Sequence, residues 1–165
     1  MVNMLKIKFA KLRPEAIIPS KRDEDSDFDL YACFEEDELV IPPFESRLIP
    51  TGIASAFAEN VGVKYEERGS NSKWCGIVQA GVIDSGYRGE WFVAVYNGNS
   101  LPVHISKRVN EVERTSSAVL VPYVKAVCQF NVREIPKVET QCVSYQEILA
   151  ERSERSTGML GSSGK

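Results

Sequence analysis

The sequence contains no long apolar run, and this limits the kind of protein that it encodes. Nowhere in its 165 residues is there a stretch approaching the roughly 20 apolar residues that a membrane-spanning helix requires. Residues 1–13 alternate apolar and charged side chains, where a secretory signal peptide would carry an apolar block. We therefore expect a cytoplasmic protein with no membrane segment.

Histidines and closely spaced cysteines are also scarce. The single histidine, His104, has no second histidine or cysteine with which to share a metal ion, so we expect an ordinary loop or strand residue. The four cysteines form no CxxC pair, and their apolar, aromatic or strand-like neighbours favour buried free thiols over disulfides or zinc ligands. These cysteines are Cys33, Cys75, Cys128 and Cys142.

The charge balance shows no strong excess of either sign. The 20 basic and 23 acidic side chains give a net charge of −3 and a pI near 5.3. A surface that binds nucleic acid carries a basic excess, so we expect no direct nucleic-acid binding. A phosphorylated ligand would need local basic groups. The length and the 43% hydrophobic content suffice for one domain with a sizeable core.

Short runs of alternating apolar and polar residues fill most of the chain. This two-residue period is typical of β-strands. Prolines and glycines fall between the runs, where turns would join the strands. The pattern predicts an all-β sandwich or jelly roll. The expected strands are 5–9, 28–33, 38–41, 47–49, 53–57, 61–65, 91–96, 119–121 and 126–132.

The C-terminal part has a different composition. Ser144 and Glu147 have the spacing of a capping box, which predicts a helix of one or two turns. From Arg152 onward the chain has almost no apolar residues, so burial cannot offset an ordering cost of about 1–2 kcal/mol per residue. We predict a single β domain over residues 1–151 and a mobile glycine-rich tail over residues 152–165.

Four segments resemble, in order and spacing, motifs of the dUTP pyrophosphatase (dUTPase) family, and a fifth resembles its motif loosely. The second and fourth depart from the family's pattern. The resemblance implies a distorted jelly roll or β-clip and a homotrimer with shared active sites. It also implies Mg²⁺-dependent hydrolysis of dUTP to dUMP and pyrophosphate, by attack of water on the α-phosphorus. The segments are 27–32 with the strand start at 50–53, then 68–73, 81–90, 125–130 and 155–164.

The most specific of these is Gly81-Val82-Ile83-Asp84-Ser85-Gly86-Tyr87-Arg88-Gly89-Glu90, which is similar to the family's uracil-binding hairpin. Its three glycines permit a hairpin with positive φ and close approach of a ligand to the backbone. The backbone of Gly81, Val82 and Ile83 would pair with the uracil edge, and cytosine would leave buried groups unpaired at a cost of about 1–3 kcal/mol each. The resemblance assigns Asp84 as the general base and Tyr87 as the filter against ribose. The alternative is a plain turn with Tyr87 as a packing residue.

The phosphate contacts implied by the resemblance come from Arg68, Gly69 and Ser70, and from Gln129. Arg68 offers a two-pronged donor, and the turn that follows offers backbone donors. Gly69 stands where the family carries serine, so that hydroxyl is missing or supplied by Ser70. The usual Gly-Asp-Arg before the glutamine motif is absent, and a structural hydrogen bond is the alternative role of Gln129. Asp29 would act on magnesium only through water, or hold a loop of the site.

The tail resembles the lid that closes over bound nucleotide. Arg155 would meet the γ-phosphate, and the backbone of Gly161, Ser162 and Ser163 would wrap the phosphates. Leu160 stands where an aromatic residue stacks on uracil in the family, so the lid loses about 1–3 kcal/mol of stacking. The alternative is a plain flexible terminus.

Two other functions remain open from the sequence. A dCTP deaminase of the same fold family would need a catalytic glutamate in a different hairpin sequence. A regulatory protein that binds dUTP as a signal is kept open by Gly69 and by residues 97–122, a segment longer than this place in the family leads us to expect. We expect residues 97–122 to form a surface hairpin.

Overall fold

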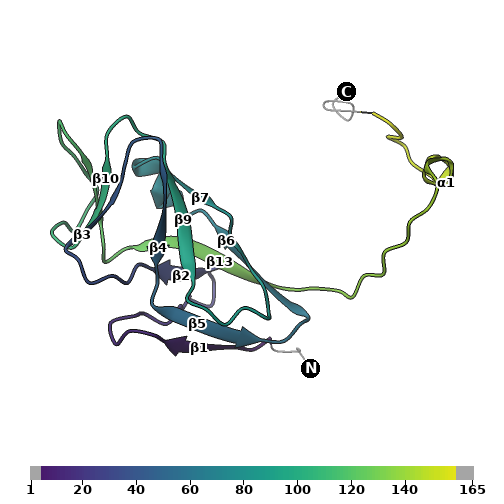
Figure 1. Cartoon of the computed structure of the whole chain (residues 1–165), viewed down its shortest axis with the longest axis horizontal. Coiled ribbons are helices and arrows are strands. Elements are labelled where there is room, and N and C mark those ends of the chain that lie inside the picture. Colours follow the sequence, from purple (N-terminus) through teal and green to yellow (C-terminus); the bar gives the residue numbers. More distant parts are fainter. Residues whose placement is uncertain (1–4, 159–165) are drawn as a thin grey trace.

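A computed structural model, which describes residues 5–158, confirms the all-β fold (Figure 1). Among the described residues there are thirteen strands, one five-residue 3-10 helix and one short α-helix. They are β1 (Ile7–Lys11), β2 (Phe28–Tyr31), β3 (Glu38–Ile41), β4 (Ser46–Pro50), β5 (Ile53–Phe57), β6 (Val61–Glu66), η1 (Gly69–Lys73), β7 (Gly76–Gln79), β8 (Val82–Ile83), β9 (Phe92–Asn97), β10 (Val103–Ser106), β11 (Glu113–Arg114), β12 (Val119–Pro122), β13 (Ala126–Glu134) and α1 (Tyr145–Ala150).

The strands form small sheets packed around one core. The sheet that positions the candidate site has the order β2-β13-β6-β8, with β13 antiparallel to both neighbours. The other sheets are β1-β5, β4-β9-β7 and β11-β12-β10-β3. Strands β6 and β9 alternate buried and less buried residues, as the two-residue period predicts. The rings of Phe9, Trp91 and Phe130 meet at the centre, and Trp91 and Phe130 are fully buried.

Residues 97–122 do not form the expected surface hairpin. Strand β10 lies inside the sheet between β3 and β12, with Val103 and Ile105 fully buried. It runs parallel to β12, a pairing that a hairpin cannot make. Only the loop and the two-residue strand β11 between them are mostly exposed. The expectation failed because two short apolar strands separated by a polar loop give the same sequence pattern in either arrangement. They can pair antiparallel as a surface hairpin, or lie parallel within a larger sheet.

Residues 135–158 form a C-terminal arm, which leaves the β-sheet body after β13 and extends away from it (Figure 1). Within residues 5–158, the last hydrogen bond and the last ion pair between the arm and the body are the bond from Ile135 N to Asn60 O at 2.7 Å and the pair between Lys137 and Glu59. The predicted capping box is confirmed, because the Ser144 side chain and Glu147 cap the start of α1 reciprocally. No residue of α1 is buried.

Two of the four cysteines contradict the expectation of buried thiols. All four are free, but only Cys33 and Cys128 are buried, whereas Cys75 and Cys142 are exposed. His104 lies on β10, where its Nδ1 is 2.9 Å from Glu38 Oε2. Within residues 5–158, no helix is long and apolar enough to cross a membrane.

Candidate active site

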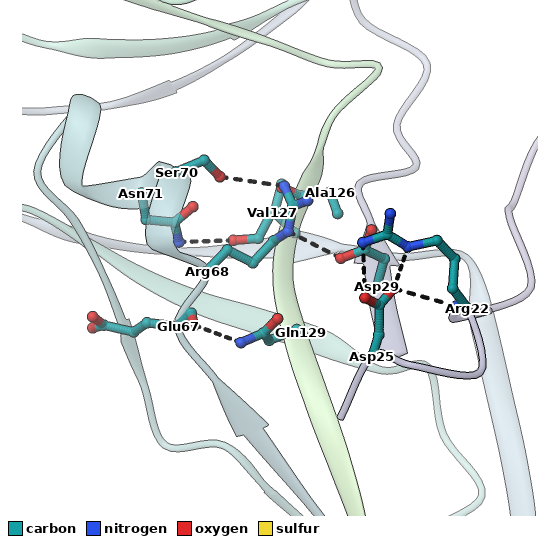
Figure 2. A network of polar contacts seen from close by, with 10 residues as sticks. All are labelled: Arg22, Asp25, Asp29, Glu67, Arg68, Ser70, Asn71, Ala126, Val127 and Gln129. Carbon is teal, nitrogen blue, oxygen red and sulfur yellow. Dashed lines mark hydrogen bonds and ion pairs between the residues drawn. The ribbon is translucent and has the colours of Figure 1, made fainter. Parts of the chain in front are cut away.

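Arg68 lies where three of the sequence segments meet. It follows β6 and precedes η1, and its Nε is 2.9 Å from Asp29 Oδ1 on β2. Its Nη1 donates to the carbonyl oxygen of Ala126 at 3.2 Å and to Ser70 Oγ at 3.3 Å. Figure 2 shows the guanidinium between the turn that carries Ser70 and the strand that carries Asp29. Sheet pairing of β13 with both β2 and β6 brings these distant segments together.

The turn after Arg68 is anchored from below by Asn71. This residue is 2% exposed, and its side-chain amide donates to the carbonyl oxygen of Val127 at 3.1 Å. Ser72 Oγ closes the turn by donating to Gly69 O at 2.7 Å. A Cβ built on Gly69 would meet no atom within 4 Å, so the backbone does not require glycine there. Asn71 was not expected to contribute, because its partner is 56 residues away in the chain.

Gln129 lies on β13, opposite both Asp29 and Glu66 in the sheet. Its Nε2 donates to the carbonyl oxygen of Glu67 at 2.9 Å, which orients the amide beside Arg68 (Figure 2). This contact is a structural hydrogen bond, which is the alternative role that the sequence left open for Gln129. The side-chain amide has a second hydrogen that this contact does not use.

Arg68, Asp29 and Gln129 border a hollow of about 780 Å³, and the sequence did not predict its other lining residues. The loop before β2 contributes Lys21 and Arg22, which carry two further positive charges. Arg22 is paired with Asp25 at 2.8 Å, and both side chains are exposed. Burial raises the pKa of the Tyr31 hydroxyl on β2, and the nearby Asp29 carboxylate raises it further. The hollow therefore combines cationic donors with carboxylates at its rim, a composition suited to a phosphorylated ligand with an associated cation.

The segment from Gly81 to Glu90 forms a separate, smaller hollow of about 220 Å³, lined by Val82, Ile83, Asp84, Tyr87, Glu90 and Phe92. It shares no residue with the hollow beside Arg68. Asp84 and Tyr87 are exposed, and the Tyr87 N–H donates to Asp84 O at 3.0 Å, which closes a turn. The base and the ring assigned from the sequence therefore lie side by side, and within one chain neither of them lines the hollow beside Arg68.

The backbone of this segment differs from the expected hairpin. Strand β8 pairs with β6, and the chain continues into β9, which belongs to another sheet. The expectation of positive φ is wrong for Gly81, Gly86 and Gly89. Gly81 is needed for space instead, because a Cβ there would lie 2.5 Å from the Cβ of Tyr65.

The far end of the segment is held by an ion pair that sequence reasoning missed. The two terminal nitrogens of Arg13, Nη1 and Nη2, donate to the carboxylate of Glu90, and the Gly52 N–H donates to Glu90 Oε1 at 2.8 Å. Burial by itself raises the pKa of Glu90, but the hydrogen bonds and the charge of Arg13 outweigh it and hold that pKa below its ordinary value. The sequence carries no signal for this pair, since its members are 77 residues apart.

Residues 152–158 of the tail lie apart from the β-sheet body in this single chain (Figure 1), and none of them lines either hollow. Arg155 is exposed, and its Nε donates to Gly158 O at 2.8 Å. Leu160, Gly161, Ser162 and Ser163 lie outside the described residues.

The residues that could meet a metal ion are few. Among residues 5–158, no group of three or more His, Cys, Asp or Glu side chains is placed to hold one. Asp29 is a single carboxylate with one oxygen engaged by Arg68. This donor set suits Mg²⁺ that is held mainly by phosphates and water, because Mg²⁺ keeps several waters and needs only one or two carboxylates nearby.

The sequence matches a family model and a curated relative along most of its length. The model of the dUTPase family matches residues 13–164. The deoxyuridine 5'-triphosphate nucleotidohydrolase of Nautilia profundicola is 33% identical over 165 aligned residues, which cover 98% of this chain and 100% of the relative.

Two solved structures of phage enzymes have the same fold. A mutant dUTPase of Staphylococcus bacteriophage 80alpha with dUpNHpp superimposes with a TM-score of 0.76 at 21% identity, covering 97% of this chain and 99% of that one. A mutant dUTPase from phage phi11 of S. aureus, which coordinates a structural Mg(II) ion, has a TM-score of 0.67 at 19% identity over 86% of this chain and 99% of that one. The match of the family model over residues 13–164, together with the full-length relative, shows that the chain belongs to the dUTPase family.

Proposed function

We propose that this chain hydrolyses dUTP to dUMP and pyrophosphate in the cytoplasm. The observation that carries the proposal is the position of Arg68, which sheet pairing places beside Asp29 and Gln129 in one hollow and which also donates to Ser70. The name of the Nautilia profundicola relative, a deoxyuridine 5'-triphosphate nucleotidohydrolase, supports the same substrate.

The phosphates of the substrate would lie in the hollow beside Arg68. Its guanidinium can turn from Ser70 and Ala126 O toward phosphate oxygens, which are stronger acceptors because they are charged. Gln129 would add its second amide hydrogen, and Ser70 would supply the hydroxyl that Gly69 lacks. These groups stabilise charge on the phosphates, which is the main task of a protein in this type of reaction.

Asp84 would act as the general base. It takes a proton from the water that attacks the α-phosphorus, while the bond between that phosphorus and the bridging oxygen breaks and pyrophosphate leaves with the electron pair. An exposed carboxylate on a turn can take this part, since cationic groups around the phosphates lower the demand on the base.

The small hollow next to Asp84 would take the nucleoside. The backbone around Gly81, Val82 and Ile83 is proposed to meet the uracil edge, and the ring of Tyr87 to lie against the deoxyribose. A ribose 2'-hydroxyl would then collide with that ring. Selection for deoxyuridine would follow from these two contacts.

Magnesium is the cofactor that we propose. When bound, Mg²⁺ supplies positive charge to the triphosphate and orients it. Asp29 would contact it through water. The structural Mg(II) ion of the phage phi11 dUTPase mutant supports a role for this metal in proteins of this fold.

A homotrimer with shared sites is the assembly that we propose. Two features support it: the hollows beside Arg68 and Asp84 share no residue within one chain, and the arm presents apolar side chains with no cover. Residues 152–165 would then serve as a lid, with Arg155 on the γ-phosphate and the backbone of residues 161–163 around the phosphates. The uncovered apolar residues of the arm are Val138, Val143, Tyr145, Ile148 and Leu149.

The proposal is tested by incubating the protein with dUTP, dCTP, dTTP or UTP, with Mg²⁺ or with EDTA, and separating the products by HPLC. We expect dUMP and pyrophosphate from dUTP alone, and only with Mg²⁺. Formation of dUTP from dCTP would indicate a deaminase. Binding of dUTP without any product would indicate the regulatory protein that the sequence left open.

A further inference from the structure

The ring of Tyr87 is seated on the backbone of its own segment. Its Oη donates to the carbonyl oxygen of Glu90 at 2.9 Å. The ring lies against Gly89. A Cβ added to Gly89 would lie 2.5 Å from Oη, 2.7 Å from Cζ and 3.0 Å from Cε2 of Tyr87. The ring thus occupies the space that any side chain at position 89 would need.

The acceptor of the Tyr87 hydroxyl is itself held firmly. The carboxylate of Glu90 is bound by Arg13 and by the Gly52 N–H. The next residue, Trp91, is fully buried, and its N–H donates to Ile53 O at 2.9 Å. A ring tied to this carbonyl has a defined place, although 43% of the Tyr87 residue is exposed.

Gly86, in the same segment, provides a direct contrast. A Cβ built on Gly86 would meet no atom within 4 Å. Neither Gly86 nor Gly89 has a positive φ, so alanine suits the backbone at both positions. The two glycines therefore differ in one respect, which is that only Gly89 leaves room for the Tyr87 ring.

We propose that Gly89 is a specificity-determining residue that acts through Tyr87. Its lack of a side chain lets the ring lie back on the segment and reach Glu90 O, and this seat fixes where the ring blocks a 2'-hydroxyl. The inference rests on the proposed function, in which Tyr87 excludes ribose. A methyl group at position 89 displaces the exposed end of the tyrosine and leaves the fold unchanged.

The experiment compares kcat/KM for UTP and for dUTP in the wild type, Gly89→Ala, Gly86→Ala, Tyr87→Ala and the double variant Gly89→Ala/Tyr87→Ala, each with Mg²⁺. We expect Gly89→Ala to raise the ratio of UTP to dUTP hydrolysis about tenfold or more, the scale on which one misplaced group changes selection in a pocket. Gly86→Ala should keep the wild-type ratio. General damage to the segment would lower both substrates together and leave the ratio unchanged.

The double variant tests whether Gly89 acts through the ring. In the Tyr87→Ala background there is nothing left for the new methyl group to displace, so adding Gly89→Ala should not change the ratio further. If Gly89→Ala failed to fold, the double variant should regain the thermal midpoint of Tyr87→Ala for the same reason.

Several results would overturn the inference: a ratio for Gly89→Ala within twofold of Gly86→Ala, an added change in the double variant, or a folding defect that Tyr87→Ala does not relieve. Failure of the proposed function would look different. In that case the wild type itself would not hydrolyse dUTP, or Tyr87→Ala would leave the ratio unchanged.

Discussion

Replacing Glu90 by glutamine should destabilise the folded chain measurably, because its carboxylate joins three separate parts of the sequence. Arg13 follows β1, Gly52 lies between β4 and β5, and Glu90 ends the segment that carries Asp84. Glutamine keeps the size of the side chain and one acceptor oxygen for the Gly52 N–H. It removes the negative charge that faces Arg13.

The magnitude follows from the burial of the pair. The side chains are 33% exposed for Arg13 and 15% for Glu90, so solvent screens them less than a surface pair. A hydrogen bond to a charged group contributes about 1.5–3 kcal/mol, and we expect Glu90→Gln to lower the free energy of unfolding by about 2 kcal/mol. For a chain of this length that corresponds to a fall in Tm of about 4–8 °C.

The pH dependence of the effect has a defined sign. In the folded chain the pKa of Glu90 lies below its ordinary value near 4.5. The ionised carboxylate therefore stabilises the folded state fully at pH values above the pKa that Glu90 has in the unfolded chain. This contribution is lost as the pH falls through the folded-state pKa. Glutamine does not titrate, so the difference between wild type and Glu90→Gln should be full at pH 7 and shrink in acid.

Thermal unfolding followed by circular dichroism, at one protein concentration and without nucleotide, measures both effects. The matched control is Glu59→Gln, which breaks the ion pair between Glu59 and Lys137. The side chain of Glu59 is 82% exposed and that of Lys137 is 92% exposed. This pair is expected to contribute nothing measurable. A Tm for Glu90→Gln within 1 °C of wild type at pH 7, or a difference that persists undiminished in acid, would refute the argument.

Four further predictions concern catalysis. Asp84→Asn should abolish hydrolysis and change nucleotide affinity by less than about tenfold, since the amide keeps the size and loses the basicity of the carboxylate; turnover within a few fold of wild type would remove Asp84 from the role of base. Tyr87→Ala should admit UTP, as shown by a higher ratio of UTP to dUTP cleavage. Gly69→Ser should fit without strain and raise kcat for dUTP severalfold if Ser70 replaces the missing hydroxyl poorly, whereas an unchanged kcat would show that Ser70 suffices. Deleting the chain from Arg152 should leave the Tm without ligand nearly unchanged and lower kcat by orders of magnitude; full activity would show that the tail is only a terminus.

The features that the sequence determined by itself are local. The two-residue period of apolar side chains identified most of the strands, because alternate residues of a strand point to the same face. The capping box of α1 was readable because Ser144 and Glu147 are three residues apart and satisfy each other's backbone groups. The segment around Asp84 and Tyr87 was recognisable for the same reason, since a short run of residues carries its motif.

The features that only the tertiary structure decided depend on residues far apart in the chain. The ion pair between Arg13 and Glu90, the contact of Arg68 with Asp29 and the parallel pairing of β10 with β12 all arise when sheets form. No local pattern encodes these partners, because strand pairing is chosen by the packing of the whole core. The same holds for Gly89, whose lack of a side chain has a purpose only once the Tyr87 ring lies over it.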